Sequence, residues 1–302
     1  MMERRIICTS ENNISAEFNY DFSPFFLKSV TGIYGISANV TTSENTTVDG
    51  STYQGSTAKE RNIVITVQMD GDYKANREFL YRVFKLKSAG KFTYMEDGDT
   101  KQIDYEVEDI DIGETGVVRD AVISLICPEP FFKDLDDVEV IMASWVDDLE
   151  FPVCFPEEGI EFGHREANLV KEIENDTGAD NIGIMAVIRA DGPVSNPAIY
   201  HSETGEYAKL EIEMARGQII ILTTGQDKKK TWLLESVSQS EIDEKGYDNL
   251  ILEKGVNINE FLSEGSEFIQ LQHGKNTLTY AADAGVNYMN VSIFYRLLYV
   301  GV

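Results

Sequence analysis

The clearest pattern of apolar and polar positions in the chain lies between residues 62 and 69. The odd positions there are Ile63, Ile65, Val67 and Met69, and the even positions are Val64, Thr66 and Gln68. A period of two in β-branched residues is typical of a strand that buries one face. The preceding stretch, 49–57, reads DGSTYQGST and has too few apolar residues to order itself. We therefore expect an exposed loop that leads into a strand.

Apolar residues at steps of three and four follow this strand and predict a helix over 72–88. Asp72 is placed to cap its start and Gly90 to end it. A hairpin comes next, with strands at 92–95 and 103–107 around a turn at 96–99. The outward positions of its second strand are Asp104, Glu106 and Glu108, which predict an acidic outer face. A further strand is expected over 117–127.

A domain boundary is predicted near residue 135, where Pro128, Pro130 and the acidic run 134–137 interrupt the pattern. Beyond it, short strand-like runs alternate with turn sequences such as 191–193 and 273–276, and no helical period is evident. We expect a mainly β protein. Residues 1–135 would form a β-sandwich or barrel-like domain with one α-helix, and residues 136–302 an antiparallel sandwich or jelly roll.

The charge of the chain excludes some classes of partner. There are 26 Lys and Arg residues against 52 Asp and Glu residues, which gives a net charge of −26. Because phosphate binding needs clustered cations, we expect no tight binding of nucleic acid or of an anionic membrane. An acidic wall would instead let DNA slide past. No apolar run approaches the ~20 residues that span a bilayer, and the first residues lack the apolar core of a signal peptide, so we expect no membrane insertion and synthesis in a reducing cytoplasm.

The residue types that carry catalysis or bind metals form no recognisable motif. Cys8, Cys127 and Cys154 are widely spaced, and we expect buried small side chains instead of a disulfide framework or a zinc site. His201 and His273 match no ligand pattern and are expected in exposed turns. No nucleophile elbow is present. We therefore expect no catalytic site, no metal and no cofactor, and a protein that is not an enzyme.

Sugar binding is one alternative that the aromatic residues raise. Trp145 and Trp232 can form a stacking platform, and Lys229 lies in a lysine run close to Trp232. Trp232 and Lys229 are thus candidate glycan contacts. The favoured interpretation is that a tryptophan within a strand belongs to the core and that a lysine run before a strand is a solvated hairpin end.

Several stretches, taken in order, resemble a known family. They are the loop and strand at 49–69, CPEPFF at 127–132, residues 151–163, NPAI at 196–199, TGEY at 204–207, and the run from 274 to 302. Together they resemble the distal tail protein (Dit) family of siphovirus-type phages, over nearly the whole chain. The resemblance implies an N-terminal domain that builds a hexameric ring at the virion tail tip. It also implies a galectin-like C-terminal sandwich that projects outward.

The resemblance also implies partners. The ring would join the tail tube protein to a tail-tip hub or tail-associated protein, and the outer domains would hold receptor-binding or baseplate proteins, with a role in tail assembly and host attachment. In this setting the segment 38–59 is expected to be an arm toward a neighbouring subunit or the next ring. Its candidate contact residues are Asp49, Gly50, Tyr53, Gly55 and Lys59. The alternative function is a carbohydrate-binding tail protein that recognises host surface glycans through its C-terminal sandwich.

Overall fold

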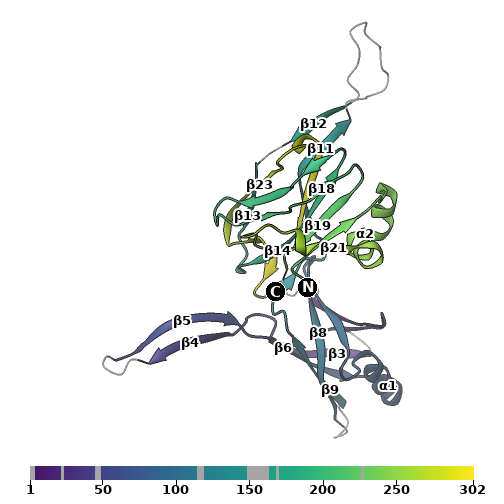
Figure 1. Ribbon diagram of the computed structural model, residues 1–302. Helices are drawn as coiled ribbons and strands as arrows, with labels where there is room; N and C mark the ends of the chain where they lie inside the picture. The colour runs from purple at the N-terminus through teal and green to yellow at the C-terminus, as the bar shows by residue number, and fades with distance from the viewer. Residues whose placement is uncertain are drawn as a thin grey trace. The chain divides into compact units, whose positions relative to one another are not determined.

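The computed structural model describes residues 4–21, 24–44, 49–113, 119–147, 163–167, 170–225 and 228–302. Strands β1 to β25 dominate these residues, which confirms the predicted mainly β class (Figure 1). The chain forms two compact units. One consists of Met1–Leu135 together with Leu298–Val302, and the other of Asp136–Leu297. The last five residues thus return to the first unit, whereas the sequence placed them in the C-terminal domain.

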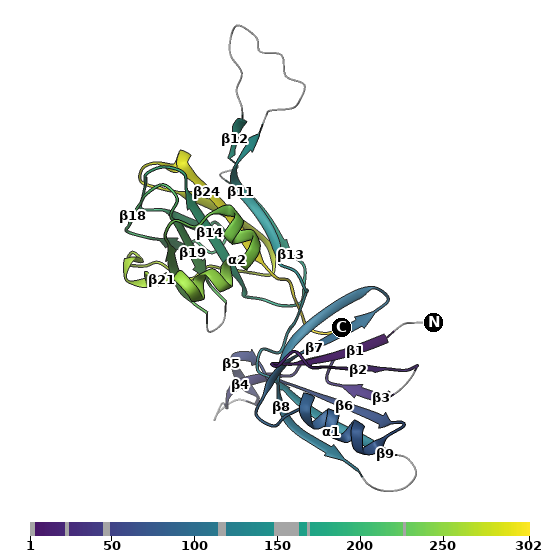
Figure 2. The same cartoon turned by 90° about the vertical axis from the view of Figure 1, so that its right-hand side faces the viewer.

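The first unit is built around a closed barrel of seven strands, in the order β8-β7-β1-β2-β3-β6-β9 with β9 paired back to β8. The strands are β1 (Arg4–Ser10), β2 (Ser15–Asn19), β3 (Phe25–Thr31), β6 (Arg61–Met69), β7 (Ala89–Glu96), β8 (Asp99–Ile112) and β9 (Arg119–Cys127). Neighbours pair antiparallel, except that β2 and β3 meet at a single parallel pair. Figure 2 shows β1, β2, β3 and β6 side by side.

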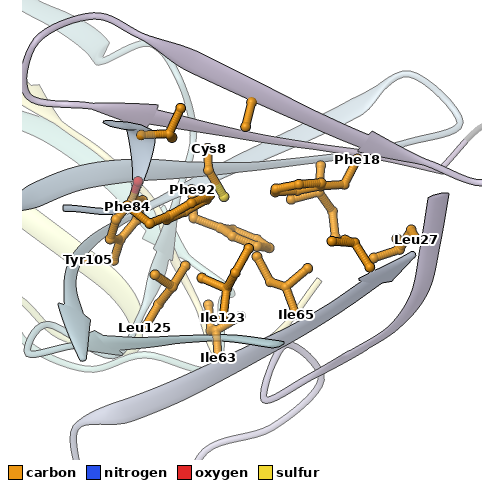
Figure 3. Packing of buried hydrophobic residues seen from close by; sticks show 14 of the residues in the cluster. Cys8, Phe18, Leu27, Ile63, Ile65, Phe84, Phe92, Tyr105, Ile123 and Leu125 are labelled. Carbon is orange, nitrogen blue, oxygen red and sulfur yellow. The ribbon is translucent and has the colours of Figure 1, made fainter. Parts of the chain in front are cut away.

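The barrel interior holds the apolar side chains that the alternation of β6 predicted. Ile63, Ile65 and Val67 are fully buried, and they face aromatic residues from the opposite wall. Figure 3 shows Phe18 and Phe92 pointing into the same interior as Ile65 and Ile123. Because each strand contributes alternate side chains, closing the barrel removes both the apolar faces and the sheet edges from water.

Two cysteines are part of this core. Cys8 and Cys127 are buried and unpaired by disulfides, as the sequence predicted. Burial raises the pKa of the Cys127 thiol to about 12 and also raises the pKa of Cys8. Cys154 lies outside the described residues.

Helix α1 (Tyr73–Val83) covers one part of the barrel core. It starts at the predicted cap, where Oδ1 of Asp72 accepts a hydrogen bond from the Ala75 N–H at 3.1 Å. It ends at Val83, earlier than the predicted 88. The following Phe84 places its ring 6.1 Å from that of Phe18 in the core, so packing redirects the chain before the helical pattern of the sequence runs out.

A buried arginine fixes the C-terminal segment to the first unit. Strand β10 (Phe132–Lys133) joins β8 to β25 (Leu298–Tyr299). Beside it, Arg61 is 3% exposed as a residue, and its guanidinium donates to backbone carbonyls from well-separated parts of the chain. The acceptors are Pro130 at 2.7 Å, Gly32 at 2.6 Å, Gly35 at 3.2 Å and Val300. Burial lowers the pKa of Arg61 from its usual value.

The second unit contains two main antiparallel sheets and a small one. The first has the order β12 (Gly163–Ala167), β11 (Val138–Asp147), β24 (Met289–Tyr295), β14 (Ile182–Ala190), β19 (Ile219–Thr223), β20 (Lys230–Leu234) and β21 (Val256–Asn257), and β22 (Gln270–Leu271) also pairs with β14. The second has the order β13 (Val170–Asn175), β23 (Gly274–Ala281), β16 (Ala198–His201) and β17 (Tyr207–Lys209). The pair β15 (Val194–Ser195) and β18 (Glu213–Met214) and two 3₁₀ turns (Asn259–Phe261 and Val286–Tyr288) complete the unit.

The second unit also contains a helix, α2 (Gln239–Lys254), so the prediction of a single helix was wrong. Gly246 has a φ of 71° inside it and divides the helix, and no apolar stripe runs along its length. Its start is nevertheless encoded in the sequence. Ser238 and Glu241 form a capping box, in which each side chain bonds to the other's backbone N–H.

Candidate interaction surfaces

The segment predicted as an exposed loop is a two-stranded hairpin, which corrects that expectation. Strand β4 (Ala38–Glu44) pairs antiparallel with β5 (Ser51–Ala58), from Ala38 opposite Ala58 to Glu44 opposite Ser51. The described residues of both strands are exposed, apart from a half-buried Gly55. Neither strand belongs to another sheet. The many hydroxyl side chains concealed the strands from a hydrophobicity pattern, although threonine favours extended backbone. We call this hairpin, residues 38–58, the arm (Figure 1).

The predicted contact residues all lie on the arm or at its base. Asp49 and Gly50 lie in the bend before β5, and Tyr53 lies within β5 with its side chain exposed. Gly55 has a φ of 152° beside the irregularity of the ladder between Thr41 and Thr42, a conformation that glycine adopts without strain. The Lys59 N–H donates to the Ser37 carbonyl at 2.8 Å and closes the base.

One face of the arm is apolar in part. Val40 and Tyr53 are 60% and 62% exposed, and the register places both on one face, since Tyr53 lies opposite Thr42 and side chains two residues apart share a face. The Tyr53 hydroxyl donates to Ser56 Oγ at 2.9 Å. An isolated two-stranded hairpin is only marginally stable in water, and exposed edges and apolar side chains are what a partner can cover.

The acidic face predicted for the β7–β8 hairpin is present on β8. Its exposed carboxylates are Asp104, Glu106, Glu108, Asp109 and Asp111. Lys133 lies 3.6 Å from Asp104, and Glu108 accepts hydrogen bonds from Asn62 and Ser124. Most of the negative charge along this strand is therefore not neutralised by neighbouring cations in the described chain.

The two candidate glycan contacts lie in different surroundings. Trp232 on β20 is half-buried and packs against a core cluster that includes Val187 and Leu234. The Nζ of Lys230 lies 5.6 Å from its ring. Lys229 is exposed and lines a hollow of about 340 Å³ together with Glu206, Glu267 and Phe268, and Trp232 is absent from this lining.

His201 is buried, so its prediction as an exposed turn residue was wrong. Its Nδ1 accepts the Thr204 N–H at 3.2 Å, and its Nε2 lies 3.0 Å from Oδ1 of Asn276. An accepting Nδ1 leaves the proton on Nε2, which donates to the asparagine. Glu203 in the same turn accepts hydrogen bonds from both the backbone and the hydroxyl of Thr277, and these bonds lower the pKa of its carboxyl. The hydrogen bonds of His201 and Glu203 to Asn276 and Thr277 thus tie the turn 201–206 to β23. The other turn histidine, His273, is exposed as predicted.

No cluster of three or more His, Cys, Asp or Glu side chains suited to a metal ion occurs among the described residues. Within the same ranges, no helix has the length and apolar character to cross a membrane.

Comparison with known proteins gives matches among solved structures. No protein-family model and no curated protein sequence matches the chain. The crystal structure of the SPP1 Dit protein (gp 19.1), described as a paradigm of the hub adsorption apparatus in phages that infect Gram-positive bacteria, aligns over 97% of this chain and 99% of its own. The TM-score is 0.64 at 12% identity. A chain of the phage P2 baseplate in its activated conformation with Ca aligns over 98% of both chains, with a TM-score of 0.51 at 7% identity. The likeness is one of fold, and it extends over both units.

Proposed function

We propose that this chain, which has the fold of the SPP1 Dit hub protein, is a structural hub subunit of a phage tail tip. The observation that carries this proposal is the end-to-end match, which covers 97% of this chain and 99% of the other at a TM-score of 0.64. A match confined to a sandwich would fit many functions, because single folds host unrelated activities. A match that includes the barrel, the second unit and their order in one chain is far more restrictive.

In the proposed assembly six copies form a closed ring through heterologous contacts. The arm supports this step, because the outer edges of its two strands pair with no other described strand and it presents the apolar pair Val40 and Tyr53. A hairpin without a core of its own gains stability when a neighbour covers it. Contacts between an arm and a different surface of the next copy close into a ring when the rotation is right. The ring joins the tail tube protein to hub or baseplate proteins.

The exposed carboxylates of β8 are proposed to face the channel of this ring. The net charge of −26 makes the chain a poor surface for phosphates, and a negative wall repels DNA that passes along it. The second unit is proposed to hold receptor-binding or baseplate proteins and so to serve host attachment. An imaged ring that places Glu106 and Asp109 on its outer side would refute the channel assignment.

The test of the hub role is the mass of the purified full chain in solution, together with negative-stain imaging. We expect a six-membered ring, and a stable monomer at micromolar concentration would contradict the proposal. Tyr53→Ser on the arm is expected to shift the population toward smaller species. Tyr81→Ser provides the matched control, because Tyr81 is 47% exposed on α1 and lies outside the arm.

A further inference from the structure

The hollow beside Lys229 lies in the second unit and is built by segments that are distant in sequence. It is lined by Glu206 next to β17, by Lys229 next to β20, and by Glu267 and Phe268 ahead of β22. Gln270 and Gln272 add two amide side chains. The hollow is open to solvent, has a volume of about 340 Å³ and is lined mainly by polar groups.

Backbone contacts hold these segments in place. The Glu267 N–H donates to the Tyr207 carbonyl at 2.7 Å, and the Tyr207 hydroxyl donates to the Glu264 carbonyl at 3.0 Å. Ser266 Oγ accepts the Lys209 N–H at 3.1 Å. The loop that carries Glu267 and Phe268 is therefore fixed to β17, and Ile269 after it is fully buried. Such a loop presents its side chains in a defined geometry before any ligand arrives.

The polar groups of the hollow divide into fixed and uncommitted ones. Nε2 of Gln270 donates to the Thr224 carbonyl at 3.1 Å, and Nε2 of Gln272 donates to Asn181 Oδ1 at 3.1 Å. These bonds orient both amides. In the described part of the chain, no hydrogen bond or ion pair engages the carboxylates of Glu206 and Glu267 or the ammonium of Lys229. The hollow thus combines oriented amides with charged groups that have no partner among the residues that the structure describes.

We infer that this hollow binds an uncharged oligosaccharide. A sugar hydroxyl both donates and accepts, so a ring of vicinal hydroxyls matches a lining that mixes carboxylate acceptors, an ammonium donor and amides. The half-buried ring of Phe268 supplies an apolar surface for the C–H face of a pyranose. Two carboxylates against one ammonium, in a chain of net charge −26, disfavour acidic sugars and phosphates.

This site differs from the one that the tryptophans suggested. The Trp232 ring packs against the core cluster of the unit and does not line the hollow. The role of Phe268 and of the two glutamates depends only on the second unit. The inference therefore stands independently of ring formation by the first unit, and a saccharide assay and a ring assay can fail separately.

Isothermal titration calorimetry of the full chain tests the inference with cellohexaose, maltohexaose and N-acetylchitohexaose as uncharged probes and hexagalacturonic acid as the acidic probe. We expect at least one uncharged hexaose to bind with a Kd of about 1 mM or tighter. Glu267→Ala and Glu206→Ala are expected to weaken that binding about tenfold each, because each removes a charged hydrogen-bonding group. Phe268→Leu is expected to weaken it similarly while keeping an apolar side chain in place.

Two controls make the outcome decisive. Glu174→Ala removes an exposed carboxylate of β13 outside the hollow, and Trp232→Phe alters the tryptophan, and both are expected to bind as the unaltered chain does. Because no hydrogen bond or ion pair within the described residues engages the carboxylates of Glu206 and Glu267, their removal is expected to leave the fold intact, and circular dichroism checks this. The inference is overturned if no uncharged probe binds at about 1 mM, if only the acidic probe binds, or if Trp232→Phe alone abolishes binding.

Discussion

Replacing Arg61 by methionine is predicted to destabilise the first unit and to release its C-terminal segment. The guanidinium donates to four backbone carbonyls, those of Pro130, Gly32, Gly35 and Val300. Its Cζ atom also lies 4.8 Å from the centre of the Phe132 ring. Methionine keeps most of the apolar stem but removes every donor.

The loss of unfolding free energy can be estimated from the carbonyl acceptors that lose their hydrogen-bond donor. A buried carbonyl left without a hydrogen bond costs about 1–3 kcal/mol. The bond to Pro130 is fully buried, and those to Gly32, Gly35 and Val300 are partly buried, where water can replace part of the loss. The sum is about 3–5 kcal/mol, a large share of the ~5–15 kcal/mol of a typical domain. It corresponds to a fall in Tm of roughly 10–20 °C for the first unit.

The distribution of tryptophan lets the two units be followed separately. Both tryptophans, Trp145 and Trp232, lie in the second unit, so tryptophan fluorescence reports only its unfolding, while calorimetry reports both units. Arg61→Met is expected to lower the temperature of the calorimetric transition of the first unit and to leave the midpoint of the fluorescence change unchanged. Lys28→Met is the control, because Lys28 on β3 is exposed and its 2.7 Å ion pair with Asp120 lies at the surface, where such a pair contributes under ~1 kcal/mol.

A chain lacking residues 298–302 sharpens this test. This chain loses the Val300 acceptor and the β25 pairing with β10. Because the truncation and Arg61→Met remove a shared contact, their combined loss of unfolding free energy should be smaller than the sum of the two separate losses. A fall of less than about 1 kcal/mol for Arg61→Met, or strictly additive effects, would refute the role assigned to this arginine.

Three further predictions concern other parts of the chain. Deleting residues 42–58 removes most of the arm without touching the barrel core, and we expect a folded protein with impaired ring or tail assembly; normal hexamers would show that the arm is dispensable. In a Cys154→Ser background, Cys8 and Cys127 should resist a thiol reagent at pH 8, because burial raises both pKa values and keeps the thiols neutral, and rapid labelling of the native protein would contradict their burial. Ser238→Ala breaks the capping box of α2 and should lower the unfolding free energy of the second unit, followed by tryptophan fluorescence, by about 1 kcal/mol. An unchanged unfolding midpoint would contradict this expectation.

Local patterns in the sequence determined several elements of this protein correctly. The alternation over 62–69 matches the buried and half-buried faces of β6, and Asp72 caps α1 as expected. The acidic positions of β8 are exposed. These features follow from side-chain period and capping, which involve residues only a few positions apart. The capping box at Ser238 was equally legible, but the Gly246 interruption and the lack of an apolar stripe hid the helix that it starts.

Only the tertiary structure decided the features that depend on distant partners. The arm is a hairpin because two polar segments pair with each other, and its polar composition carries little hydrophobic signal. His201 is buried because Asn276, far along the chain, satisfies its Nε2, and Arg61 is buried because carbonyls from as far away as Val300 receive its donors. A polar residue enters a core only where the fold supplies its hydrogen bonds. The sequence determined which segments alternate and where helices start, and the assembled barrel and sandwich determined which polar groups lie inside them.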